Sequence, residues 1–300
     1  MQIRFVTVDV FTDRKFGGNQ LAVVPQAAAL TSEQMQSIAA EFNFAETTFV
    51  LPPQDASHTA EVRIFTPRSE LPFAGHPNIG TAYVLATDSE GYPRALPDPI
   101  LFEEKAGLVR LSLMRQGASV VGARLTPPQS LVRGDDIDVD IVAAACSLTP
   151  ADIETANHRP CIASCGIPLA FAELKSRAAL TAAQPRTDVF MADLPAESHH
   201  RRAALRQGSN RRIRPASAHV RAALRRAGGP GHRQRERRAC RTVGEPAARA
   251  DLKLHLRIAQ GVDMGRPSLL EASAEKKNGK LVGLLIGGRC VPMMRGTLEV

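Results

Sequence analysis

The chain has 300 residues and a hydrophobic fraction of 44%, enough for two ordinary domains or one large one. No apolar run approaches the roughly 20 residues that cross a bilayer, and five scattered cysteines indicate neither a disulfide framework nor a zinc site. The first residues lack the basic-then-apolar layout of a signal peptide, so the sequence predicts a soluble, cytoplasmic protein.

The net charge of +8 comes from one segment. Residues 200–250 hold 15 arginines, no lysine and two acidic residues, whereas 23 basic and 28 acidic residues elsewhere give a net charge of −5. An argument for nucleic-acid binding therefore depends on this segment alone.

The first half of the chain predicts strands around one exposed and one buried helix. Helix 30–42 is marked by Thr31 and Gln34 at capping-box spacing and by an apolar stripe. The run at 75–86 indicates a tight turn that opens a buried helix. Strand patterning is predicted over 3–11, 45–51, 60–67, 107–113 and 119–125, and 16–25 indicates a glycine turn that leads into a second strand.

The second half follows a predicted linker at 127–136. Its predicted elements are a helix or strand at 136–146, an interrupted strand at 160–174, a short helix at 177–185, a strand at 188–194 and four strands after 249. Mixed strands with one principal helix per half predict an α+β or α/β protein of two similar lobes. Residues 196–249 fit no such pattern, and their Arg, Ala, Gly and Pro content is typical of disorder.

His76 is the first candidate for chemistry. Gly75 before it allows backbone N–H groups to approach a ligand closely, and Pro77 suits the first position of a helix. The free N–H groups from Asn78 onward are donors that hold carboxylates and developing oxyanions. The spacing alone leaves open that this histidine only caps a turn.

Glu46 is the second candidate, at the junction between helix 30–42 and the next strand. Flanking Phe44 and Phe49 would partly desolvate its carboxylate, the condition that tunes a general acid or base. The residue pattern by itself favours the alternative of a solvated glutamate at a strand start.

Four separated motifs then carry a family resemblance. In chain order, VDVFTDRKFGGNQLAVV, AAEFNFAETTFV, FTPRSELPFAGHPNIGTAYVL and IAQGVDMGRPSLLEA resemble the phenazine-biosynthesis isomerase-like (PhzF-like) family over 1–195 and 252–300. The resemblance implies the diaminopimelate-epimerase-like fold, in which each of two lobes is a curved mixed sheet wrapped around a central helix. It places an N-terminal lobe at 1–126 plus a C-terminal strand at about 290–300, and a C-terminal lobe at 127–289.

The resemblance also implies a function. It predicts an isomerase or epimerase, without metal or organic cofactor, that moves a proton on a small carboxylate-bearing substrate, cyclic or amino-acid-like, in the cleft between the lobes of a homodimer. Glu46 matches the family's proton-shuttling glutamate and His76 its Gly-His-Pro histidine. Asn78 stands where the family more often has threonine. The expected substrate contacts are Asn19, Gly75, Pro77 and Asn78.

Three other functions are compatible with parts of the sequence. A two-cysteine epimerase is disfavoured because His76 holds the place of the first thiol and Cys165 lacks a matching context, so that Cys161 and Cys165 are expected to be packing residues. A nucleic-acid-binding protein would use the arginines of 200–250, but that segment lacks lysine, aromatic residues and a recognisable module. A dimeric scaffold protein without catalytic activity is the third alternative, if residues 196–249 are the true gene product.

The second-lobe motif of the family, Asp-Pro-Ala-Thr-Gly-Ser-Ala, is absent, and residues 196–249 occupy its place. Back-translated with suitable third bases and read one base later, 229–239 encodes Asp-Pro-Ala-Thr-Gly-Ser-Ala-Asn-Ala-Ala-Leu, and 219–223 encodes Met-Phe-Ala-Pro-Leu. We hypothesise that a compensated pair of frameshifts spans about 196–249. Without this motif and its helix, the chain as written is expected to fold poorly or to be inactive.

Overall fold

The computed structural model describes residues 1–165, 168–193 and 250–300. The expectations for 196–249, including the missing motif and its helix, lie outside the described residues. The chain divides into two compact units, one formed by Met1–Gln129, His255–Ala274 and Gly283–Val300, the other by Ser130–Leu254 and Glu275–Val282. The first unit thus includes 255–274, which the sequence assigned to the second lobe, because the turn before Ser268 bonds to residues near the start of the chain.

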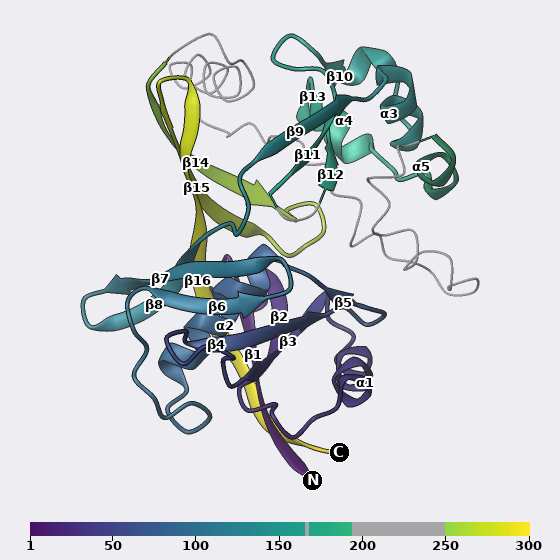
Figure 1. The fold of residues 1–300 in the computed structure, drawn as a ribbon. Coiled ribbons are helices and arrows are strands. Elements are labelled where there is room, and N and C mark those ends of the chain that lie inside the picture. The colour runs from purple at the N-terminus through teal and green to yellow at the C-terminus, as the bar shows by residue number, and fades with distance from the viewer. Residues whose placement is uncertain (166–167, 194–249) are drawn as a thin grey trace. The chain divides into compact units, whose positions relative to one another are not determined.

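Eight strands of the first unit close into a ring (Figure 1). In ring order they are β1 (Gln2–Val10), β2 (Asn19–Val24), β3 (Glu46–Leu51), β4 (Ala60–Phe65), β6 (Ile100–Glu104), β7 (Gly107–Gln116), β8 (Ser119–Thr126) and β16 (Lys280–Glu299). Residues 286–289 of β16 pair with β8 and residues 290–299 pair with β1, so this single strand closes the barrel. Closure leaves the ring without a free edge.

Three strands lie beside this ring. The short β5 (Glu70–Leu71) pairs with β4, and β15 (Ser268–Lys277) and β14 (Leu252–Gln260) continue the sheet from β16. The pairs β2–β3 and β4–β6 are parallel, whereas the neighbouring pairs are antiparallel. The sheet is therefore mixed, as the sequence predicted.

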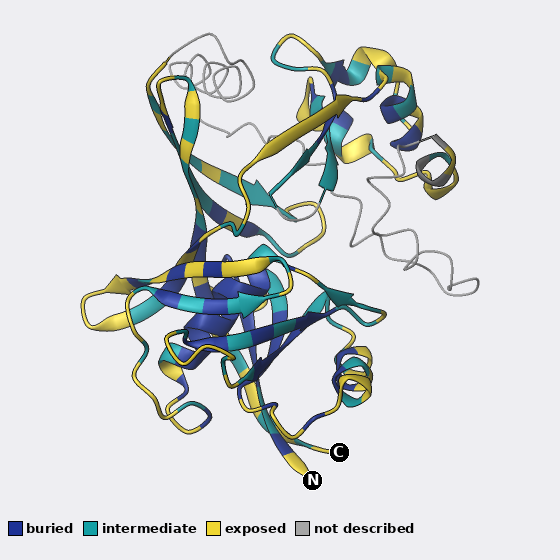
Figure 2. Ribbon diagram, viewed as in Figure 1, coloured by how far each residue is buried: buried dark blue, intermediate teal, exposed yellow. Residues whose placement is uncertain are grey.

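Helix α2 (Gly75–Thr87) is enclosed by the barrel. It contacts β1, β2, β3, β7 and β8, and its residues from His76 to Leu85 are all buried (Figure 2). Its sequence is apolar or small on every side, which is the pattern of a helix surrounded by protein. The buried helix predicted at 75–86 is confirmed.

Helix α1 (Ser32–Phe42) packs on β3 and β4 and builds a second hydrophobic cluster. Thr31 Oγ1 accepts a hydrogen bond from Gln34 N, and Thr31 N donates to Gln34 Oε1, which is the predicted capping box. Met35, Ile38 and Ala39 are buried, so the apolar stripe faces the sheet as predicted.

The second unit has smaller elements around a core of its own. They are β9 (Val132–Asp136), α3 (Val139–Ala145), η1 (Pro150–Asp152), β10 (Ile153–Glu154), β11 (Cys161–Ser164), β12 (Pro168–Phe171), β13 (Glu173–Leu174), α4 (Arg177–Ala182) and α5 (Thr187–Asp193). The linker predicted at 127–136 contains β9, and the strand predicted at 188–194 is helical. Short apolar runs do not distinguish these two states, and Asp188 in the first turn of α5 favours the helix.

Candidate active site

Three of the predicted residues meet at one end of the barrel. Asn19 is the first residue of β2, Glu46 is the first of β3, and His76 is the second of α2. Because β2 and β3 run parallel, with Leu21 opposite Glu46, both strands begin at the same end. The His76 Nε2 atom lies 3.4 Å from Glu46 Oε2, and Asn19 Nδ2 lies 3.1 Å from His76 Nδ1.

The facing atoms of His76 and Glu46 are buried without hydrogen-bond partners. The two side chains are only 9% and 13% exposed, and neither Nε2 nor Oε2 has a partner among the described residues. Buried polar atoms are normally satisfied, so an orphaned acid and base that face each other indicate a functional site. The partial desolvation of Glu46 expected from its position is observed.

Asn19 sets the state of the imidazole. In the orientation that the structure gives, the Asn19 amide nitrogen faces His76 Nδ1, which favours the tautomer with the proton on Nε2, the atom nearer Glu46. Burial lowers the pKa of His76, opposed by the charge of Glu46 and by a backbone hydrogen bond of Gln20. The lowered pKa of His76 favours the uncharged imidazole beside Glu46.

The first turn of α2 contributes backbone donors. Its N-cap residue, Ala74, makes no side-chain cap hydrogen bond, and a Cβ placed on Gly75 would meet no atom within 4 Å. Uncapped N–H groups beside open space suit an anionic group of a substrate.

Pro77 and Asn78 are buried within this turn. The Asn78 amide donates to Ala74 O at 2.9 Å, so its side chain braces its own helix in this structure. Substrate contact by these two residues stays a prediction.

Two residues that the sequence did not single out support the same end of the barrel. Asp9 on β1 is paired with Arg266 at 2.5 Å, and Arg266 also donates to the carbonyl oxygens of Gly17 and Gly18, just before Asn19. In the sequence, Asp9 is marked only as an acidic residue inside an apolar strand, and Arg266 only as an arginine in a Gly-Arg-Pro turn. Neither signal reveals its partner 257 positions away.

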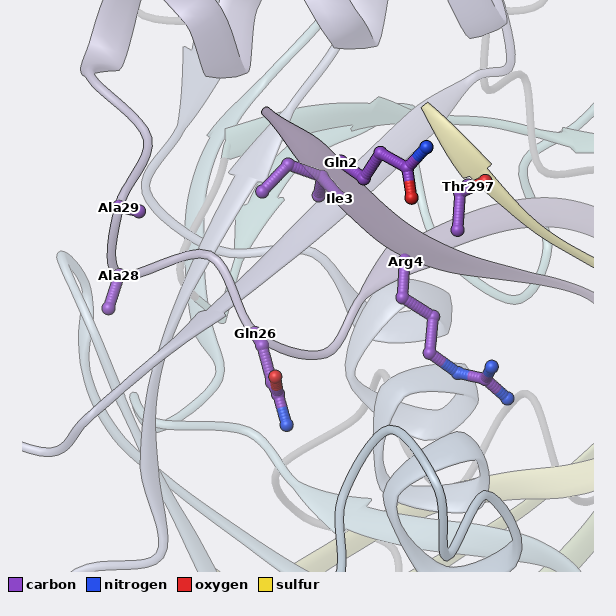
Figure 3. Close-up of a pocket in the computed structure, with 7 residues that line it drawn as sticks. All are labelled: Gln2, Ile3, Arg4, Gln26, Ala28, Ala29 and Thr297. Atoms are coloured by element: carbon purple, nitrogen blue, oxygen red, sulfur yellow. The ribbon is translucent and has the colours of Figure 1, made fainter. Parts of the chain in front are cut away.

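A pocket of about 500 Å³ lies elsewhere in the first unit. It is lined by Gln2, Ile3, Arg4, Gln26, Ala28, Ala29 and Thr297 (Figure 3). The Arg4 guanidinium is already paired with Asp88 at 2.8 Å and with Glu90 at 2.9 Å. This pocket shares no residue with the candidate site, and the buried acid–base pair is the stronger indication of chemistry.

Within residues 1–165, 168–193 and 250–300, no three His, Cys, Asp or Glu side chains are grouped as a metal site would need. In the same ranges, no helix has the length and apolar character needed to span a bilayer.

The mixed barrel around a buried helix is the α+β fold that PhzF-family, epimerase and racemase structures share. The chain belongs to the family described as phenazine biosynthesis-like protein, whose model matches residues 8–216. It is 33% identical to an uncharacterised isomerase of Mesorhizobium japonicum, over 100% of both chains. It is 32% identical to trans-2,3-dihydro-3-hydroxyanthranilate isomerase of Pseudomonas chlororaphis, over 98% of both chains. The chain is an isomerase of this family, as predicted.

Solved structures agree on the fold. A PhzF-family protein of Bacillus anthracis superposes with a TM-score of 0.76 at 18% identity, over 100% of both chains. A predicted epimerase of Pseudomonas aeruginosa gives a TM-score of 0.70 at 24% identity over 99% of both chains, and a probable proline racemase of Agrobacterium radiobacter gives 0.52 at 14% over 99% of this chain and 93% of its own. The predicted fold class is confirmed.

Proposed function

We propose that this isomerase moves a proton on a small carboxylate-bearing substrate without a cofactor, with Glu46 as both general base and general acid. The observation that carries the proposal is the buried pair of unpartnered atoms, Glu46 Oε2 and His76 Nε2, 3.4 Å apart at the start of α2. An unsatisfied carboxylate in a desolvated place is suited to proton transfer with a bound carbon acid.

The roles follow from the hydrogen-bonding capacity of each group. Glu46 takes a proton from a carbon next to a carbonyl or conjugated system, and the electron pair moves into that system as an enolate. The Nε2–H of His76 and the uncapped N–H groups of Gly75 and His76 donate to the developing negative charge. Glu46 then returns the proton at a different carbon on the same face of the substrate.

The substrate class is taken from a relative. The Pseudomonas chlororaphis enzyme is named for trans-2,3-dihydro-3-hydroxyanthranilate, a cyclic amino acid with a carboxylate and conjugated double bonds. Such a ring supplies both an acidified C–H bond and an anionic group for the start of α2. We propose this chemical class for the present chain, together with a homodimeric, cytoplasmic enzyme.

Glu46→Gln tests the proposal. With trans-2,3-dihydro-3-hydroxyanthranilate as the probe in deuterated buffer, the protein whose reading frame is restored over 196–249, used here as the wild type, is expected to convert it and to place solvent deuterium on carbon. Since general acid–base catalysis contributes about 10²- to 10⁴-fold, Glu46→Gln should slow conversion by at least about 10²-fold, measured by mass spectrometry and proton NMR.

Glu41→Gln is the matched control, because Glu41 is an exposed glutamate at the end of α1. It should exchange deuterium at the wild-type rate. Exchange by Glu46→Gln at the wild-type rate would falsify the assignment of Glu46.

A further inference from the structure

An ion pair within the first unit joins residues from the two ends of the chain. Asp9 on β1 is 3% exposed, and Arg266 lies in the turn between β14 and β15. The Arg266 Nη2 atom is 2.5 Å from Asp9 Oδ1, and the other carboxylate oxygen of Asp9 accepts from Phe16 N at 2.9 Å. The carboxylate is thus occupied on both oxygens, by a guanidinium and by a backbone N–H group.

The same guanidinium also holds the backbone that leads into the candidate site. Arg266 Nη2 donates to Gly17 O at 2.8 Å and Nε donates to Gly18 O at 3.2 Å, while Gly18 N donates to Pro267 O at 2.9 Å. Phe16 has φ 65 and Gly18 has φ 65, so this segment takes a conformation that a free loop of ordinary residues avoids. The bonds from Arg266 and Asp9 compensate that strain.

The next residue along the chain is Asn19, whose amide donates to His76 Nδ1 at 3.1 Å. That contact favours the tautomer with the imidazole proton on Nε2. A small displacement of the backbone at 17–18 would move the Asn19 amide out of hydrogen-bonding range and release the tautomer. Arg266 is therefore linked to the pair of His76 and Glu46 through Asn19 alone.

We propose that Arg266 is a positioning residue for the reaction: it fixes residues 16–18 so that Asn19 holds His76 with its Nε2 proton toward Glu46. This inference rests on the function proposed above for Glu46 and His76. Arginine suits the task because its planar fork donates in several fixed directions, whereas lysine supplies a single point charge.

The variant Arg266→Lys keeps the positive charge but removes the planar guanidinium group. The ammonium can still neutralise Asp9, so the variant should fold, but it cannot reproduce the bonds to Gly17 and Gly18. We expect kcat for trans-2,3-dihydro-3-hydroxyanthranilate to fall roughly 10- to 100-fold, as for a misplaced catalytic group, with KM within about twofold of wild type. Guanidinium at millimolar concentration should restore part of the loss in Arg266→Ala, whereas a merely structural role would give no rescue.

A readout without substrate keeps this test independent of the proposed function. In ¹⁵N-histidine-labelled protein, the signal that disappears in His76→Gln identifies His76, and its nitrogen shifts report the tautomer. Wild type should show the proton on Nε2, and Arg266→Lys should show a mixture. Arg124→Lys is the control, since Arg124 pairs with Glu271 on the surface at 3.1 Å.

The outcomes are distinguishable. If Arg266→Lys changes the His76 tautomer while the wild-type protein shows no isomerase activity, the positioning role holds and the proposed reaction is wrong. An unchanged His76 signal in both Arg266→Lys and Arg266→Ala would overturn the positioning role, whatever the activity.

Discussion

Glu104, the last residue of β6, is a buried carboxyl that the proposed reaction does not use. Both of its oxygens are buried and lack a hydrogen-bond partner among the described residues, as does the nearby Asn78 Oδ1. Burial raises the pKa of Glu104 to about 8, against a smaller lowering by the Asn78 side chain. A neutral acid is cheaper to bury than an anion, so Glu104 is mostly protonated at pH 7, beside the first turn of the helix that carries His76.

Glu104→Gln should change how stability depends on pH. In the wild type the folded pKa of about 8 exceeds the ordinary value of 4.5, so the folded state binds more protons between these limits. Its contribution to the free energy of unfolding is full below about pH 4.5 and is lost as pH rises to about 8, by up to roughly 1.4 kcal/mol per pH unit. Glutamine carries no such proton, so the variant should gain on wild type as pH rises. Urea unfolding at pH 5, 6.5 and 8 measures this, with Glu41→Gln as control, and parallel curves for Glu104→Gln and wild type would contradict it.

At the scale of elements, the sequence predicted those helices and strands that depend on interactions between residues close together in the chain. The capping box of α1 involves residues three apart, and the buried helix α2 is apolar along one short run, so both were predictable from their own sequence. Glu46 and His76 became credible only through the family motifs, because each alone also fits a strand start or a turn. Closure of the barrel by β16 depends on pairings with β1 and β8, which no local pattern encodes.

The packing of α2 inside the barrel can be tested at Gly80. A Cβ there would lie 2.5 Å from Leu21 Cδ2 and 2.8 Å from Val10 Cγ2, and both side chains are fully buried. Overpacking costs about 1–3 kcal/mol, whereas alanine regains about 1 kcal/mol of helix propensity. Gly80→Ala should therefore lower the free energy of unfolding by up to about 2 kcal/mol. The same substitution at Gly75, where a Cβ meets nothing within 4 Å, should not lower it. Equal stability of the two variants would show that α2 is not tightly enclosed.

At the scale of the whole molecule, the charge distribution and the family match change within the same stretch. The family model matches residues 8–216 and so ends inside the arginine-rich segment, while β14 begins the described structure again near residue 252. The chain as written has 15 arginines in the stretch where the family resemblance predicts the second-lobe motif. GC-rich coding read one base out of frame produces Arg, Ala, Gly and Pro, so one compensated pair of frameshifts would explain both the charge and the missing motif.

The frame hypothesis predicts that a gene restored by one base over 196–249 encodes the better enzyme. The motif Asp-Pro-Ala-Thr-Gly-Ser-Ala would supply a carboxylate and backbone donors that the arginine-rich sequence does not encode. We expect the restored protein to unfold cooperatively and to exchange substrate deuterium at least about 10²-fold faster than the chain as written, since general acid–base catalysis contributes 10²- to 10⁴-fold. The chain as written, prepared in parallel, is the matched control. Resequencing the codons for 190–255 and measuring the intact mass of the native protein decide whether the frameshifts are present in the gene or are sequencing errors. A native mass that matches the 300 residues as written, with activity equal to that of the restored protein, would refute the hypothesis.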